Sequence, residues 1–88
     1  MDKVNFISTA DFDNIPKRAT EFSAGYDLYA THYYELGPLK RVLMPLQLRM
    51  EIPPQYCGLI LPRSGLAAKY GVTVLNSPGL IDSDYRGE

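Results

Sequence analysis

Apolar and polar residues alternate along two segments of the chain, which is the pattern of a half-buried β-strand. Residues 44–52 show it most clearly: Leu46, Leu48, Met50 and Ile52 fall on one face, and Gln47, Arg49 and Glu51 on the other. Residues 24–30 repeat it with Ala24, Tyr26, Leu28 and Ala30 on one face and Gly25, Asp27 and Tyr29 on the other. We therefore predict a strand in each segment.

Shorter apolar runs follow, and prolines and glycines separate them. Residues 57–61, 72–75 and 80–82 are strand-like. Gly37-Pro38 marks a turn, and Pro53-Pro54 ends the strand before it, because proline cannot donate to a ladder. Many short strands with turn signals between them predict an all-β sandwich or barrel. Within the apolar run we expect Cys57 to be a buried structural thiol.

A single short helix is predicted over residues 66–70, with Gly71 as its left-handed cap. It follows Pro62-Arg63-Ser64-Gly65, where serine is a good N-cap and a helix start presents unpaired N–H groups. Glycine permits close approach of a ligand and Arg63 adds a cation, so the segment is a candidate phosphate cradle. The alternative is an ordinary capped helix with a surface arginine.

A hairpin is predicted around Ser77-Pro78-Gly79, with Pro78 and Gly79 at the centre of a type II turn. Its open edge offers a rigid row of N–H and C=O groups that a planar base can pair with. Asn76 adds an amide donor and acceptor at the same place. The alternative is a plain hairpin with a turn asparagine.

Carboxylates follow the hairpin. In an extended segment Asp82 and Asp84 share one face, where paired carboxylates bind Mg²⁺ or supply a general base. Equally, Asp84 and Arg86 can form a surface ion pair of little energetic worth. Asp27, on the outward face of the 24–30 strand, is a solvated residue, a partner of an arginine or a supporting residue near a metal.

Composition narrows the function classes. The 88 residues amount to one domain at most, and the net charge of −1 has no basic cluster for a polynucleotide partner. One cysteine and one histidine cannot build a usual zinc site, and the absence of a disulfide suits an intracellular compartment. No apolar run approaches the length of a membrane span, and we see no targeting signal.

Three segments together, in order and spacing, resemble the first three sequence motifs of the homotrimeric dUTPase family. They are residues 24–30, 62–67 and 79–88, the last being Gly-Leu-Ile-Asp-Ser-Asp-Tyr-Arg-Gly-Glu. The resemblance implies a dUTP diphosphatase that hydrolyses dUTP to dUMP and pyrophosphate and keeps uracil out of DNA. It also implies a distorted jelly-roll β-barrel of the β-clip type, assembled as a homotrimer with active sites at the subunit interfaces.

The resemblance assigns roles to individual residues. Asp82 matches the aspartate that orients the attacking water and meets the 3′-hydroxyl, and Tyr85 matches the tyrosine that packs on the deoxyribose and rejects UTP. Asn76, Gly79, Leu80 and Ile81 match the uracil-binding hairpin, and Arg63, Ser64 and Gly65 match the phosphate-binding loop. Asp27 matches a supporting aspartate. The cofactor is Mg²⁺, held mainly by the substrate phosphates rather than by direct protein ligands.

Two departures from the family pattern stand out. The sequence stops after the third motif, so we expect residues 1–88 to be a single dUTPase-like domain truncated at its C-terminal side, with an incomplete barrel. Activity of these residues alone does not follow from family membership. Pro45-Leu46-Gln47 also stands where the family often has a Thr-Gly pair.

Two alternatives belong to other function classes. A dCTP deaminase has a related fold and a similar Pro-Arg-Ser loop, but a different third motif. A non-catalytic dUTP-binding or regulatory module would keep the fold without turnover.

Overall fold

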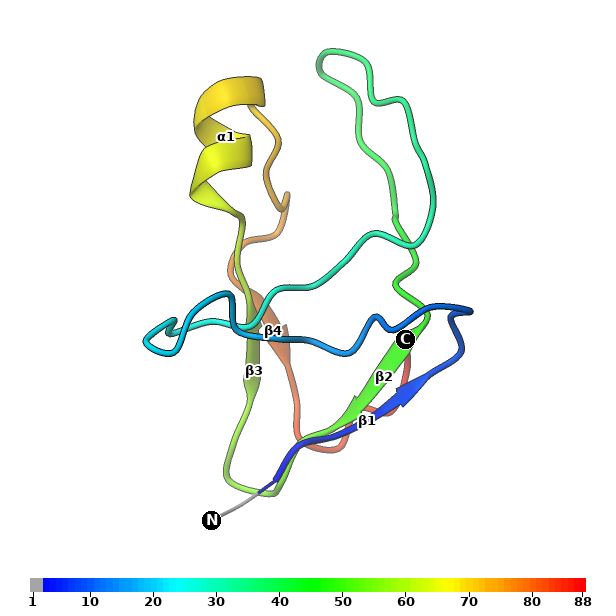
Figure 1. Cartoon of the computed structure of the whole chain (residues 1–88), viewed down its shortest axis with the longest axis vertical. Helices are drawn as coiled ribbons and strands as arrows, with labels where there is room; N and C mark the ends of the chain where they lie inside the picture. Colours follow the sequence, from blue (N-terminus) through cyan, green and yellow to red (C-terminus); the bar gives the residue numbers. More distant parts are fainter. Residues whose placement is uncertain (1–2) are drawn as a thin grey trace. The chain divides into compact units, whose positions relative to one another are not determined.

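The computed structural model describes residues 3–88 and contains, over that range, four strands and one helix. They are β1 (Asn5–Ser8), β2 (Leu48–Glu51), β3 (Gly58–Ile60), α1 (Ser64–Tyr70) and β4 (Gly79–Ile81) (Figure 1). β1 pairs with β2 and β3 pairs with β4, giving two two-stranded sheets. The prediction of a strand-rich chain with one short helix is confirmed, while the described residues do not close into a barrel.

The described residues fall into two compact units. One comprises residues 3–5 with Glu51–Arg86, and the other comprises Phe6–Met50 with Gly87–Glu88. All but one of the candidate site residues belong to the first unit; the exception is Asp27.

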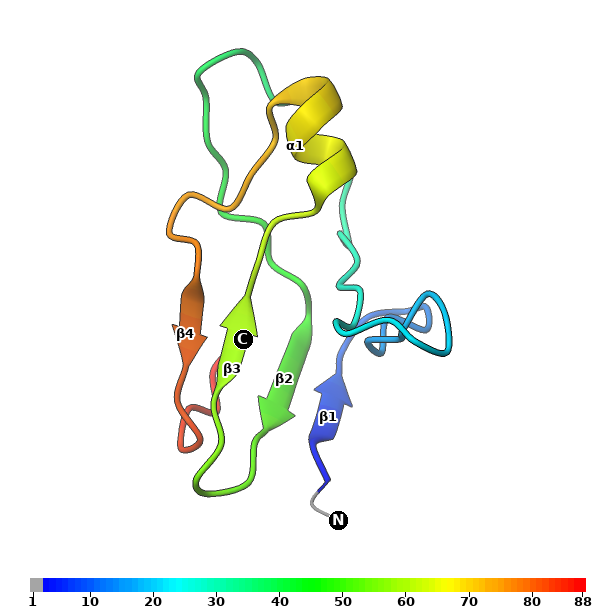
Figure 2. The same ribbon diagram turned by 90° about the vertical axis from the view of Figure 1, so that its left-hand side faces the viewer.

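The first unit is organised by the antiparallel pairing of β3 with β4, which lie side by side in Figure 2. Gly58 lies opposite Ile81, Leu59 opposite Leu80, and Ile60 opposite Gly79. A Cβ atom on Gly58 would lie 3.2 Å from Ile52 Cδ1 and 3.3 Å from Ile81 Cβ. A side chain at this position would therefore require the two isoleucines to shift by a few tenths of an ångström.

Helix α1 ends as the sequence predicts. Gly71 has φ 66° and ψ 22°, and its N–H donates to the Ala67 carbonyl, which is a left-handed glycine cap. The start differs from the prediction: Arg63 is the N-cap residue, with extended φ and ψ, and Ser64 is already helical. No side chain caps this end, so the predicted serine N-cap is wrong.

The predicted type II turn at Pro78-Gly79 is also wrong. The Ser77–Pro78 peptide is cis, Gly79 is the first residue of β4, and the nearby turn closes from the Ser77 N–H to the Val74 carbonyl at 3.1 Å. Residues 72–75 form no strand, and β4 pairs with β3 instead. The sheet is thus built from segments distant in sequence rather than from a local hairpin.

Two other proline turns have the positive φ that a type II turn requires at its third residue. Lys40 donates to the Gly37 carbonyl at 3.2 Å, with Leu39 at φ 60°, which confirms the predicted turn at Gly37-Pro38. Tyr56 donates to the Pro53 carbonyl at 3.2 Å, with Gln55 at φ 74°.

In the second unit, side chains that bind backbone groups add to the backbone pairing. Asn14 is 2% exposed; its amide nitrogen donates to the Leu46 carbonyl at 2.8 Å, and its oxygen accepts from the Ser8 hydroxyl. The predicted strand over residues 24–30 is wrong, because only one backbone bridge forms there, between Asp27 and Lys17.

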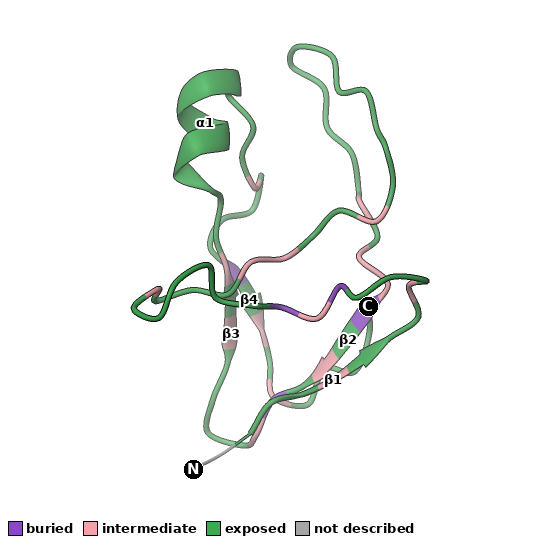
Figure 3. Cartoon of the chain, in the orientation of Figure 1, coloured by how far each residue is buried: buried purple, intermediate pink, exposed green. Residues whose placement is uncertain are grey.

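The alternation predicted for residues 44–52 is confirmed over residues 48–52 only, since the strand covers Leu48–Glu51 and Gln47, predicted to point outward, is half-buried. Leu48 and Ile52 are the buried apolar residues, at 7% and 5% exposure, and Arg49 and Glu51 are exposed (Figure 3). Many other large apolar side chains are exposed, including Leu59 and Leu80, which pair across the β3–β4 ladder. Cys57 is exposed too, so the expectation of a buried thiol is wrong. Among residues 3–88 no helix is long and apolar enough to cross a bilayer.

Candidate functional site

Strand β4 is at the centre of the candidate site, because the base-binding and water-binding candidates adjoin its two ends. Among the described strands it pairs with β3 alone. In an antiparallel pair, half of the N–H and C=O groups of each strand point away from the partner. Because this direction alternates from residue to residue, the outer edge of β4 offers unladdered backbone groups at alternate positions among buried Gly79, exposed Leu80 and half-buried Ile81, and it is an edge of a different sheet from the predicted hairpin.

Asn76 lies beside the first residue of β4. A Cβ atom on Gly79 would lie 3.5 Å from Asn76 Nδ2, 3.8 Å from Asn76 Oδ1 and 3.4 Å from Ile60 Cβ. The Asn76 amide is thus close enough to Gly79 that a Cβ there would be in ordinary van der Waals contact with it. Donor and acceptor groups of an amide and a strand edge are brought to the same place.

Arg63, Ser64 and Gly65 lie at the start of α1, directly after β3. The Arg63 carbonyl accepts from the Ala67 N–H at 3.0 Å, which leaves the first-turn N–H groups without intrahelical partners. All three residues are exposed, and a Cβ atom on Gly65 would meet nothing within 4 Å. This geometry gives open access to the backbone at the helix start.

Within one chain, the phosphate-loop candidates and Asp82 leave the β3–β4 ladder at opposite ends. Ile60, three residues before Arg63, pairs with Gly79, whereas Ile81, next to Asp82, pairs with Gly58. With about 3.3 Å of rise per strand residue, Arg63 and Asp82 are separated by roughly 10 Å or more along the strands. The structure brings Asn76 and Gly79 together but does not bring Arg63 to Asp82.

Asp82 and Tyr85 belong to one tight turn. The Tyr85 N–H donates to the Asp82 carbonyl at 3.1 Å, with Ser83 and Asp84 between them. The predicted extended segment, with Asp82 and Asp84 on one face, is therefore wrong. The turn instead brings the backbones of Asp82 and Tyr85 together, and both residues are exposed.

Arg86 fastens this turn, a role that the sequence did not indicate. Its Nη1 donates to the Ser83 carbonyl at 2.6 Å and to the Tyr85 carbonyl at 3.0 Å. Its Nε lies 3.9 Å from Glu51 Oε2, and Glu51 Oε1 accepts from the Asn5 side-chain amide at 3.0 Å. Arg86 therefore forms an ion pair with Glu51, not with Asp84 as the sequence allowed. The sequence signal for this ion pair was that the alternating pattern of residues 44–52 places Glu51 on the outward face of the strand.

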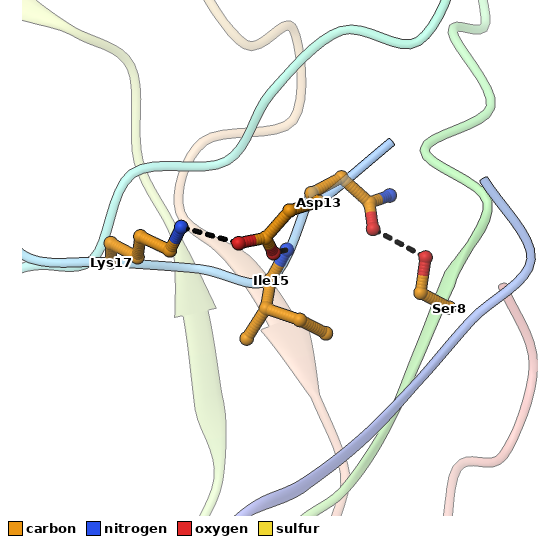
Figure 4. Close-up of polar contacts among 5 residues, drawn as sticks. Ser8, Asp13, Ile15 and Lys17 are labelled. Atoms are coloured by element: carbon orange, nitrogen blue, oxygen red, sulfur yellow. Dashed lines mark hydrogen bonds and ion pairs between the residues drawn. The ribbon is translucent and has the colours of Figure 1, made fainter. Parts of the chain in front are cut away.

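Asp27 is half-buried in the second unit, where its N–H donates to the Lys17 carbonyl at 2.7 Å. The nearest described charge pair on the same segment joins Lys17 Nζ to Asp13 Oδ2 at 2.6 Å (Figure 4). The hydrogen bond from Lys17, with a second from the Ile15 N–H, lowers the pKa of Asp13, and the same carboxylate raises the pKa of Lys17. These shifts belong to a surface ion pair rather than to a catalytic group.

Within residues 3–88, no group of three or more aspartate, glutamate, histidine or cysteine side chains is placed to hold a metal ion. Magnesium in phosphoryl-transfer sites is commonly held by one or two carboxylates together with substrate phosphates. Isolated, exposed carboxylates such as Asp82 fit that arrangement and do not fit an all-protein metal cage.

Comparison with known proteins gives the family. The dUTPase family model matches residues 13–88. A deoxyuridine 5′-triphosphate nucleotidohydrolase from Wolbachia sp. subsp. Brugia malayi is 59% identical over 76 residues, covering 84% of this chain and 49% of that protein. The proteins of the same name from Dictyoglomus turgidum and Mycolicibacterium gilvum are 50% and 49% identical and are covered to 53% and 48%. The chain thus spans about half the length of the curated relatives it matches, and it belongs to the dUTPase family.

Proposed function

We propose that the protein is a dUTP diphosphatase, which hydrolyses dUTP to dUMP and pyrophosphate. The observation that supports this best is the succession of an open backbone edge at β4 and a tight turn that holds Asp82 beside Tyr85. In a pyrimidine nucleotide the sugar follows the base, so the base edge would lie along β4 and the sugar at the turn. The names of the relatives support the same substrate.

In this proposal uracil binds along β4. The backbone groups of Gly79, Leu80 and Ile81 pair with the base edge, and the Asn76 amide, held beside Gly79, completes the pattern. Cytosine presents a different arrangement of donors and acceptors, so it would leave buried groups unpaired. Mismatches of this kind can discriminate by about 10⁴–10⁵.

Asp82 and Tyr85 act at the sugar and at the α-phosphorus. Asp82 orients the attacking water and meets the 3′-hydroxyl, while the Tyr85 ring packs on the deoxyribose and leaves no room for a 2′-hydroxyl. The turn that joins them fixes their spacing, which supports a shared role at one nucleotide.

Arg63, Ser64 and Gly65 bind the phosphates through the guanidinium and the N–H groups at the start of α1. Bound Mg²⁺ would supply neutralisation of the triphosphate charge, held mainly by the phosphates, with Asp27 in a supporting role. The residues of this chain position and bind; they hold a water and the substrate in line for displacement.

Assembly into a homotrimer is part of the proposal, together with a jelly-roll barrel for the single domain to which residues 1–88 belong. The trimer is supported by the finding that the phosphate-loop candidates and Asp82 leave the β3–β4 ladder at opposite ends. Since Arg63 and Asp82 of one chain diverge, a complete site requires phosphate-binding residues from another copy.

The test is release of dUMP and pyrophosphate from dUTP by the purified protein, compared with Asp82→Asn and with the matched control Asp84→Asn. Loss of a group that orients and deprotonates water lowers turnover by about 10²–10⁴, and Asp84→Asn should have little effect. Turnover that survives Asp82→Asn would refute the role of that residue. Tyr85→Ala should relax discrimination against UTP, and incubation with dCTP should yield no dUTP.

A further inference from the structure

The turn after β4 cannot be held by its own backbone alone. One hydrogen bond, from the Tyr85 N–H to the Asp82 carbonyl at 3.1 Å, closes it. All of its residues except half-buried Ser83 are exposed, so packing supplies little restraint. Exposed turns with a single bond open readily to solvent. If Asp82 and Tyr85 act on one nucleotide, the restraints on this turn fix the distance between them.

The Arg86 guanidinium supplies that restraint. A single nitrogen, Nη1, donates to the carbonyls of both Ser83 and Tyr85, at 2.6 and 3.0 Å. Ser83 lies within the turn and Tyr85 is its last residue, so the cation ties the middle of the turn to its end. Hydrogen bonds from a charged donor are stronger than those between neutral groups.

The guanidinium is itself oriented from the far side. Glu51 at the end of β2 places Oε2 3.9 Å from Arg86 Nε, and its Oε1 accepts from the Asn5 amide at 3.0 Å. The Arg86 and Glu51 side chains are 52% and 55% exposed, so their ion pair contributes little to global stability. Its effect is therefore local: it aims the arginine at the turn.

We propose that Arg86 is a positioning residue that holds the Asp82–Tyr85 turn in its nucleotide-binding geometry, with Glu51 and Asn5 orienting the guanidinium. The catalytic consequence rests on the proposed function, whereas the structural consequence does not. Arg86 touches neither the base nor the reacting atoms; it acts through the backbone of the two residues that do.

The experiment compares Arg86→Met, Arg86→Lys and Glu51→Gln with the matched control Arg49→Met, an exposed arginine on β2. The first readout is native-state amide hydrogen exchange at Tyr85, followed by NMR in the purified protein. Arg86→Met should speed exchange at this amide about tenfold, while the urea midpoint of unfolding and the Arg49→Met rate stay close to wild type. Arg86→Lys should restore part of the protection, and Glu51→Gln should give a smaller acceleration.

The second readout is kinetic. Arg86→Met should lower kcat for dUTP about tenfold and reduce discrimination against UTP, with a smaller change in KM. Glu51→Gln should add nothing in the Arg86→Met background, because it acts through the arginine.

Two failures can be told apart. Unchanged Tyr85 exchange in Arg86→Met overturns the positioning role, whatever the activity. Wild-type protein that does not hydrolyse dUTP overturns the proposed function, while faster Tyr85 exchange in Arg86→Met would still support the structural role.

Discussion

Residues 58–81, the paired region, contain β3, α1 and β4, whereas residues 9–47, the loop region, contain no helix or strand in the structure. The paired region is held by backbone pairing, and glycines at Gly58 and Gly79 permit close contacts with Ile81, Ile60 and Asn76. The loop region has isolated backbone hydrogen bonds and side chains that bind backbone groups, among them the buried Asn14. The two regions therefore depend on different single residues.

This difference shows what replaces regular structure where strands do not form. Buried backbone groups must be paired by something, and in the loop region polar side chains do so. A buried polar group left without its hydrogen-bond partner lowers the free energy of unfolding more than a small steric conflict does, because neighbouring side chains can move to relieve the conflict. The comparison therefore predicts that the loop region contains the more sensitive position.

The largest effect is expected for Asn14→Ala. The change leaves the Leu46 carbonyl without its 2.8 Å donor and the Ser8 hydroxyl without its acceptor. Loss of a buried hydrogen-bonded group should lower the free energy of unfolding by about 2 kcal/mol, measured by urea denaturation. Ser8→Ala is the control and should cost less, because it removes the bonds of an exposed hydroxyl to Asn14 Oδ1 and the Ala10 N–H but keeps the bond from Asn14 to the Leu46 carbonyl. A smaller effect for Asn14→Ala than for Gly58→Ala would reverse the comparison.

Gly58→Ala tests the paired region. The added Cβ would lie 3.2 Å from Ile52 Cδ1, which can move, and 3.3 Å from Ile81 Cβ, which is close to the backbone and moves less easily. Overpacking, partly offset by a less flexible unfolded chain, should cost about 1 kcal/mol in the same assay. Gly65→Ala, where a Cβ meets nothing within 4 Å, is the control and should not destabilise the protein. If Gly58→Ala were as stable as wild type, Ile52 and Ile81 would move aside without a measurable cost in free energy.

Gln47→Gly should stabilise the protein. Gln47 has φ 52°, in the left-handed region, where a side chain is unfavourable and glycine is not. Relief of this strain exceeds the added freedom of the unfolded chain by about 0.5 kcal/mol. The control Arg49→Gly, in β2, should have the opposite sign, because glycine weakens a strand. Destabilisation by Gln47→Gly would mean that its side chain contributes more than its backbone costs.

The smallest effect concerns the Asp13–Lys17 ion pair at the surface of the loop region. The pKa of Asp13 is lowered in the folded protein, so its contribution is present above the unfolded pKa and is lost as the pH falls through the folded value. Asp13→Asn should therefore lower the stability slightly at neutral pH and by progressively less below about pH 4, which flattens the acid limb of the stability profile. An equal loss at every pH would point to the Ile15 N–H bond instead.

Features that depend on neighbouring residues were predictable from the sequence. The alternation in residues 44–52 placed Leu48 and Ile52 inside, and Gly71 ended the helix, because both follow from local backbone geometry. The strand predicted over residues 24–30 failed because its pattern did not meet a partner strand beyond a bridge at Asp27. A segment with alternating apolar and polar residues forms a strand only when a neighbouring strand pairs with it.

The sequence motifs supply the candidate site residues, but the arrangement of these residues was not predictable. The motifs pointed to Asn76, Asp82 and Tyr85, yet β4 pairs with β3 rather than with residues 72–75. The carboxylates do not lie extended, because the chain turns between Asp82 and Tyr85, where Arg86 also binds two carbonyls. Pairing between distant segments leaves no trace in a local pattern, and a charged residue reveals its partner only when the chain has folded.

The antiparallel ladder of β3 and β4 has a genetic consequence. It directs Arg63 and Asp82 of one copy away from each other, so in the proposed trimer two defective alleles damage different halves of each site. Coexpression of an Arg63-defective allele with an Asp82-defective allele would then restore some intact sites, although each is inactive when expressed alone. Such complementation between null alleles is a signature of sites shared among copies.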